Sequence, residues 1–160
     1  MANDDDVIVS WQDAYSVGVP LVDDQHKGLI DLTNRLYAAC RKGKEFSQAV
    51  FLQTVRGAVD YVGYHFSTEE RMMKRVNYPD YLVHKQQHEE FVRTVAREVD
   101  KFTSGKEFSP QDFVIFLKEW VLNHIACTDT RMGQYFLNLE KQGGFEGVSL
   151  QEIQDDASRT

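Results

Sequence analysis

The residues of this sequence best suited to chemistry are its histidines, which recur at the spacing of helical turns. His84 and His88 are four residues apart in the stretch HKQQHEE, and Glu69 follows His65 by four residues. Residues four apart lie on the same face of an α-helix, so each pair can act on one partner. Imidazole nitrogens and carboxylate oxygens are ligands for transition-metal ions. The spacing therefore raises the prospect of a metal site built from helices.

All five histidines lie on the apolar side of their helices. His84 and His88 are in phase with Phe91 and Val95, and out of phase with the surrounding Lys, Gln and Glu residues. The inward set consists of His26, His65, Glu69, His84, His88, His124 and Asp129. A lone histidine or one H-x3-H pair would also fit an ordinary hydrogen-bonded core residue. A buried carboxylate is costly unless it is paired or bound to a metal, so the complete set favours a cation site.

The donor types narrow the choice of metal. Nitrogen and oxygen donors without an evident thiolate disfavour an iron–sulfur cluster, and seven donors exceed the four ligands of a structural zinc site. Two octahedral ions fit better. Five histidines, two bridging carboxylates and a bridging oxo or hydroxo group would fill all their positions except one. That open position suits iron and a small ligand such as dioxygen.

The spacing of His124 and Asp129 leaves one question open. Residues five apart on a regular helix differ by about 140°, so these two side chains would not share a face. Either Asp129 reaches across the end of the site, or the helix widens into a π-type turn near Cys127 and Thr128. Cys127 is expected to pack toward the core as a small apolar residue, without binding metal.

Four long periodic segments must position these residues. We expect helices from Pro20 to about Gly43, from Ser47 to Val76, over 81–102, and from Ser109-Pro110 through Ile125. Pro79 is expected in the first turn of the third helix, and a shorter helical stretch over 132–141. Short connections and the lack of strand-like alternation predict an all-α, antiparallel up-down-up-down four-helix bundle. The expected divisions are an extended arm at 1–19, the bundle at 20–142 and a flexible polar tail at 143–160.

The composition argues against several classes of binding partner. The chain of 160 residues has a net charge of −7 and no basic stripe, which disfavours nucleic acids and anionic membrane surfaces. The start has no basic, apolar signal sequence, and no stretch approaches the roughly 20 apolar residues of a membrane span. Two cysteines form no disulfide framework. We therefore expect a cytoplasmic protein.

The ligand pattern resembles that of the hemerythrin family, in its stand-alone bacterial branch. The resemblance rests on His26, H-x3-E at 65–69, H-x3-H at 84–88 and H-x4-D at 124–129. Flanking stretches such as YSVGVPLVDDQH, HFSTEERMM, YPDYLVHKQQHEEF and WVLNHIACTD fit as well. The similarity extends over about residues 10–140, and no ligand position departs from the family pattern.

The resemblance implies two iron ions with an oxo or hydroxo bridge. His84, His88 and His124 would hold one iron, His26 and His65 would hold the other, and Glu69 and Asp129 would bridge them. Dioxygen would bind reversibly at the open position of the second iron. The resemblance also implies an oxygen pocket, although ordinary core packing explains its members equally well: Leu29, Phe66, Trp120, Val121 and Ile125.

The expected function is reversible dioxygen binding for storage, delivery or sensing, without enzymatic turnover. A diiron oxidase or peroxidase, or a nitric oxide scavenger, is the alternative. A third reading is an interaction module whose metal only holds the fold, but the open coordination position argues against it. Sensing would require a separate protein partner, which the sequence does not identify, because the tail at 143–160 is too short for an effector domain.

Overall fold

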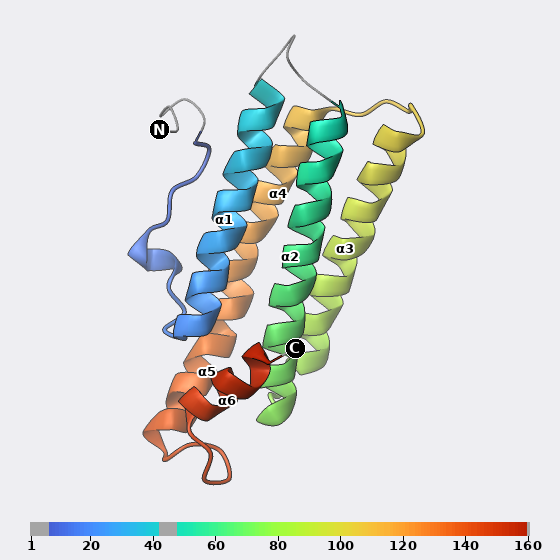
Figure 1. Cartoon of the computed structure of the whole chain (residues 1–160). Helices are drawn as coiled ribbons and strands as arrows, with labels where there is room; N and C mark the ends of the chain where they lie inside the picture. Colours follow the sequence, from blue (N-terminus) through green and yellow to red (C-terminus); the bar gives the residue numbers. More distant parts are fainter. Residues whose placement is uncertain (1–6, 42–47, 160) are drawn as a thin grey trace.

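Four long antiparallel helices make up most of the molecule. The computed structural model describes residues 7–41 and 48–159. The helices are α1 (Pro20–Arg41), α2 (Gln48–Arg75), α3 (Tyr81–Thr103) and α4 (Pro110–His124), and they run alternately up and down (Figure 1). No strand occurs in those two ranges, so the predicted all-α bundle is confirmed.

The fourth helix does not end at His124. It passes through a π-helical turn, η4 (Ile125–Asp129), into α5 (Thr130–Lys141). The short helix α6 (Leu150–Ser158) then folds back across the end of the bundle (Figure 1). Before the bundle, the arm contains one 3-10 turn, η2 (Asp13–Tyr15).

Local sequence signals explain most helix boundaries. The Ser109 side chain accepts a hydrogen bond from the Asp112 N–H at 3.2 Å, and Pro110 occupies the first turn of α4, as predicted. The prediction that Pro79 lies in the first turn of the third helix is wrong, because α3 begins only at Tyr81 with Asp80 as its N-cap. The boundaries expected at Gly43 and Ser47 lie outside the described residues.

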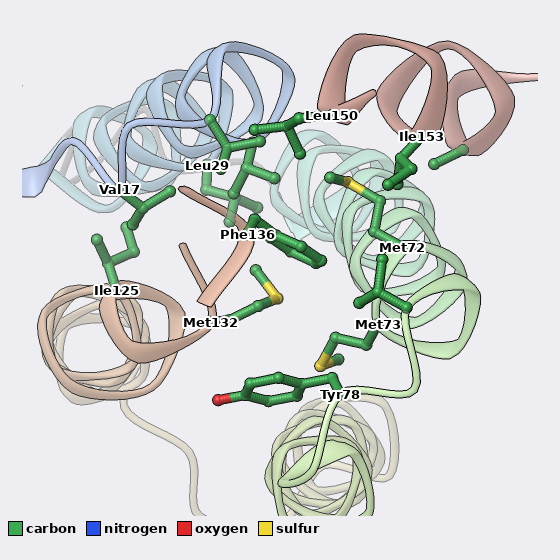
Figure 2. Packing of buried hydrophobic residues seen from close by; sticks show 14 of the residues in the cluster. Val17, Leu29, Met72, Met73, Tyr78, Ile125, Met132, Phe136, Leu150 and Ile153 are labelled. Carbon is green, nitrogen blue, oxygen red and sulfur yellow. The ribbon is translucent and has the colours of Figure 1, made fainter. Parts of the chain in front are cut away.

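The buried apolar side chains form two clusters. The first, here called the upper core, gathers Leu36, Cys40, Phe51, Val55, Phe66, Phe91, Val95, Phe113, Val114 and Leu117. The second, the lower core, includes Val22, Leu29, Met72, Met73, Val76, Ile125, Met132 and Phe136, with contributions from the arm and α6. Figure 2 shows lower-core side chains from the arm, α2, α5 and α6 converging on Phe136. Apolar packing thus extends to both sides of the inward polar residues along the bundle.

The arm is tied along the bundle by named contacts. The Asn34 amide accepts from the backbone N–H groups of Ile8 and Val9 at 3.0 and 3.1 Å and donates to the Val9 carbonyl at 2.8 Å. Val17 is buried against α5, where the backbone of Gly133 lies so close to it that no side chain would fit. The arm therefore closes one side of the lower core.

The C-terminal segment differs from expectation. The predicted flexible polar tail at 143–160 contains α6, whose Leu150, Ile153 and Ala157 are buried in the lower core. Arg71 of α2 donates two hydrogen bonds to the Ala157 carbonyl, at 3.1 and 2.6 Å. The prediction of mobility is wrong because burial of these three apolar side chains anchors the helix. Among the described residues, no helix is long and apolar enough to cross a membrane.

Candidate metal centre

All four bundle helices contribute to one buried polar layer. His26 comes from α1, His65 and Glu69 from α2, and His84 and His88 from α3. His124 is the last residue of α4, and Asp129 lies in η4, the π-helical turn. None of the seven residues is more than 5% exposed. Their candidate ligand atoms form two groups, each with all atoms within 4.8 Å of one another, and Glu69 and Asp129 belong to both groups. The structure therefore brings together every residue of the predicted set.

The first group is built on three imidazoles. The Nε2 atom of His124 lies 3.1 Å from that of His88 and 3.2 Å from that of His84. Glu69 Oε2 lies 3.3 Å from His84 Nε2 and 3.2 Å from His88 Nε2. Asp129 Oδ1 lies 3.1 Å from His84 Nε2 and 3.2 Å from His124 Nε2. The five donor atoms all lie within 4.8 Å of one another, close enough to face one ion.

The second group uses the other oxygen of each carboxylate. Asp129 Oδ2 lies 3.1 Å from His26 Nε2. Glu69 Oε1 lies 3.7 Å from His26 Nε2 and 3.5 Å from His65 Nε2. Each carboxylate therefore turns one oxygen toward the three-histidine group and one toward the two-histidine group. That is the arrangement of a bridging ligand between two ions.

The π-helical turn answers the question of the five-residue spacing. The N–H of Thr130 donates to the carbonyl of Ile125, five residues back, which defines the wide turn. The extra residue per turn places Asp129 on the same side as His124. Cys127 is exposed, so its predicted packing toward the core is wrong. The wide turn that brings Asp129 inward leaves Cys127 on the outside.

Unpaired atoms in the layer fit a cation. Both oxygens of Glu69, both oxygens of Asp129 and both nitrogens of His26 are buried without a hydrogen-bond donor or acceptor. Lone pairs of imidazole nitrogens about 3 Å apart repel each other unless a proton or a metal ion lies between them. Neutral histidine and ionised carboxylate are also the forms that bind metals. The donor set therefore fits two cations with nitrogen and oxygen ligands.

The pKa shifts of the inward residues also indicate a site for positive charge. Burial works to lower the pKa of His26, but the nearby carboxylates of Asp129 and Glu69 outweigh burial and raise the pKa to about 9. The same balance raises the pKa of His84 to about 9, whereas burial lowers the pKa of His65 to about 4. Burial works to raise the pKa of Glu69, yet the surrounding histidines hold that pKa well below its usual range. Two ionised carboxylates are thus buried, and positive charge must accompany them.

Outer hydrogen bonds set the orientation of two imidazoles. Gln25 Oε1 lies 3.0 Å from His65 Nδ1, and Glu70 Oε1 lies 3.4 Å from His88 Nδ1. An acceptor at Nδ1 keeps the proton there and leaves Nε2 free to bind a metal. The sequence analysis missed both residues. Gln25 could have been found, because its four-residue spacing from Leu29 places it on the inward face of the helix.

The five residues of the expected oxygen pocket fall into three kinds of position. Leu29, Val121 and Ile125 are buried in the lower core. Phe66 stacks on His88 with ring centroids 3.7 Å apart, and Trp120 stacks on His124 at 4.4 Å. Leu29 and Val121 also line an apolar cavity, whereas Phe66, Trp120 and Ile125 do not. The aromatic pair therefore supports ligand imidazoles directly.

Comparison with known proteins places this architecture in a defined class. An antiparallel helical bundle with a buried layer of histidines and carboxylates is the class of bundle-core metalloproteins. Residues 17–136 match the family model described as "Hemerythrin HHE cation binding domain". The chain belongs to the hemerythrin family. Hemerythrins hold a diiron centre and bind dioxygen, and the seven-residue layer suits such a centre.

Individual relatives support the assignment over most of the chain. The bacteriohemerythrin of Stenotrophomonas maltophilia is 31% identical over 153 residues, covering 91% of this chain and 97% of that protein. The bacteriohemerythrin of Methylococcus capsulatus is 32% identical, covering 79% and 95% respectively. A wild-type hemerythrin crystal structure superposes with a TM-score of 0.74 at 30% identity, covering 80% of this chain and 97% of that one.

Proposed function

We propose that the seven inward residues hold two iron ions and that the protein binds dioxygen reversibly for storage, delivery or sensing. His84, His88 and His124 hold one ion, His26 and His65 hold the other, and Glu69 and Asp129 bridge them. The observation that supports the proposal is that Glu69 and Asp129 each have one oxygen beside the three-histidine group and the other beside the two-histidine group. Bound ferrous ions supply the electrons that reversible attachment of dioxygen requires.

The unequal groups favour one side for the incoming ligand. The three-histidine group offers one donor from each of five residues, and the two-histidine group offers one from each of four. With a bridging oxygen counted for both ions, only the second group has room for a further ligand. His26 and His65 are therefore the residues beside which dioxygen binds.

The surrounding side chains restrict proton delivery. Leu29, Val121 and Ile125 are apolar and at most 6% exposed. Their packing keeps bulk water from the layer and so slows irreversible oxidation. Five neutral imidazoles also make the donor set less anionic than a glutamate-rich set, which supports reversible binding over an oxidase or peroxidase activity.

Visible spectroscopy tests the function. The protein is loaded with ferrous iron without air, exposed to air, and then purged with inert gas. We expect a charge-transfer band that appears with air and disappears on purging. Permanent bleaching with release of peroxide would indicate an oxidase, and decay driven by nitric oxide alone would indicate a scavenger.

The ligand assignment is tested separately with Glu69→Gln. The amide cannot bridge two cations as a carboxylate does, so we expect fewer than two irons per chain by colorimetric assay. Glu90→Gln, at an exposed position of α3, is the matched control and should keep two. Two irons in the Glu69 variant would refute the bridging assignment.

We also propose a cytoplasmic location and no direct partner among nucleic acids or membranes. Cys40 and Cys127 are both free thiols, which suits a reducing compartment. A sensing role would add a protein partner whose binding to this chain changes with oxygen. Cell fractionation with a tagged chain tests the location.

A further inference from the structure

An apolar cavity of about 400 Å³ lies inside the bundle, on one side of the metal-site layer. It is lined by residues that follow His26 on α1, precede His65 on α2, follow His88 on α3 and precede His124 on α4. Because neighbouring helices are antiparallel, these four stretches lie on the same side of the layer. The cavity therefore occupies the half of the bundle that holds the upper core.

The inner end of the cavity comes close to the site. Four lining residues, one on each helix, are three positions from a layer histidine: Leu29, Val62, Phe91 and Val121. Thr33 also lines the cavity, but its hydroxyl already donates to the Leu29 carbonyl at 2.8 Å. A water molecule needs two to four polar partners to be held in a cavity, and this wall offers few. The space is therefore suited to an apolar occupant.

The mouth of the cavity opens between α2 and α3. Val59 on α2 and Val92 on α3 line it and are 43% and 47% exposed, which is high for valine. Arg56 and Asp60 also line it, one helical turn apart and exposed. Their opposite charges leave the mouth without a net preference for an anion or a cation.

We infer that this cavity binds a small, uncharged, elongated apolar molecule, with its inner end beside the metal-site layer. A dry apolar cavity of about 150 Å³ is enough for benzene, and ligand pockets begin near 300 Å³. The present volume therefore takes a molecule larger than benzene, such as an alkyl chain of medium length. A charged head group would lose hydration at this apolar wall without a net opposite charge to offset the loss, so an uncharged head group is favoured over a carboxylate or an ammonium group.

Isothermal titration calorimetry with 1-octanol tests the inference. It is carried out on the iron-loaded protein, with octanoate and octylammonium as charged probes of the same chain length. We expect one molecule of 1-octanol per chain, a negative heat-capacity change and weaker binding of both charged probes. Because this readout does not depend on oxygen, failure of oxygen binding would leave it unaffected.

Two glycines on α2 provide a matched pair of variants. A side chain at either Gly57 or Gly63 meets no atom within 4 Å, but only Gly63 lines the cavity. Both Gly→Leu changes improve helix propensity. Gly63→Leu should weaken 1-octanol binding by at least about tenfold, and Gly57→Leu by less than about twofold.

Three results would overturn the inference. They are no saturable binding of 1-octanol, equal effects of the two leucine variants, or tighter binding of octanoate than of 1-octanol. A fourth result, a dimer that dissociates only in Gly63→Leu, would overturn it as well, because the exposed valines would then form a contact between two copies of the chain.

Discussion

The side-chain amide of Gln25 contacts the imidazole of His65 on the side away from the metal site, with 3.0 Å between Oε1 and Nδ1. Both side chains are at most 4% exposed. The Gln25 Nε2 group lies 3.3 Å from the Thr68 hydroxyl, which in turn donates to the Tyr64 carbonyl. A chain of hydrogen bonds between α1 and α2 thus fixes which nitrogen of His65 faces the metal site.

Gln25→Leu should weaken iron binding. Loss of the acceptor frees the ring and its tautomer, and losses of outer partners typically cost about 10- to 100-fold in metal affinity. Competition with a chromophoric chelator measures that affinity. Gln25→Glu keeps an acceptor at the same place and should retain both irons. Equal affinities of the Leu variant and the unaltered protein would show that Gln25 has no such role.

The π-helical turn gives a prediction for insertion and deletion. Deleting Cys127 leaves His124 and the aspartate four apart, within about 40° of each other on a regular α-helix, so two irons should still bind. Inserting an alanine after Cys127 instead turns Asp129 away by about 100°, and fewer than two irons should bind. Iron per chain is the measurement.

An alanine inserted after Glu146, in an exposed turn, is the control and should leave the iron content unchanged. If the deletion lost iron as completely as the insertion, the wide turn itself would be needed, beyond its effect on helical phase.

The docking of α6 predicts a loss of stability on truncating one side chain. Ile153 is 3% exposed within the lower core. Ile153→Ala should therefore lower the free energy of unfolding by about 2–5 kcal/mol in urea denaturation of the iron-loaded protein. Gln151→Ala, on the exposed side of the same helix, should change it by at most about 0.5 kcal/mol. Similar small effects of both changes would mean that α6 does not stabilise the bundle.

Stability of the metal-free protein should depend on pH in a defined direction. The pKa of His26 is raised from 6.5 to about 9, and so is that of His84. A raised pKa in the folded state stabilises fully below pH 6.5, and that contribution is lost as the pH rises toward 9. The pKa of His65 is lowered to about 4, so its neutral form stabilises above pH 6.5 and that contribution is lost toward pH 4.

The urea midpoint of the metal-free protein should therefore decline between pH 6.5 and 9. In the iron-loaded protein, metal replaces the protons on His26 and His84, so this decline should be much smaller. A metal-free midpoint that stayed constant up to pH 9 would contradict the assignment of these protons.

The sequence predicted the bundle and the inward set of seven residues because helical periodicity ties spacing to direction. His84 and His88 share the phase of Phe91 whatever the rest of the chain does. A periodic pattern of 20 to 30 residues averages out single exceptions, which is why the four helices were recognised and only boundary details such as Pro79 were wrong.

The sequence contains a signal for α6 that is weaker than the signals for the four long helices. Leu150, Ile153 and Ala157 follow helical spacing, and Ser149 and Glu152 form a capping box. A helix of nine residues is not stable in isolation, so only its contacts with the lower core decide whether it forms.

Tertiary structure alone decided the remaining features. The choice between a long reach by Asp129 and a π-helical turn depends on the position of α4 relative to α1 and α3, which spacing does not contain. The pairing of Gln25 with His65 and of Glu70 with His88 likewise joins residues on different helices. By itself the sequence determined which side chains turn inward. The packing of the helices decided how each carboxylate divides its oxygens and where space remains beside them.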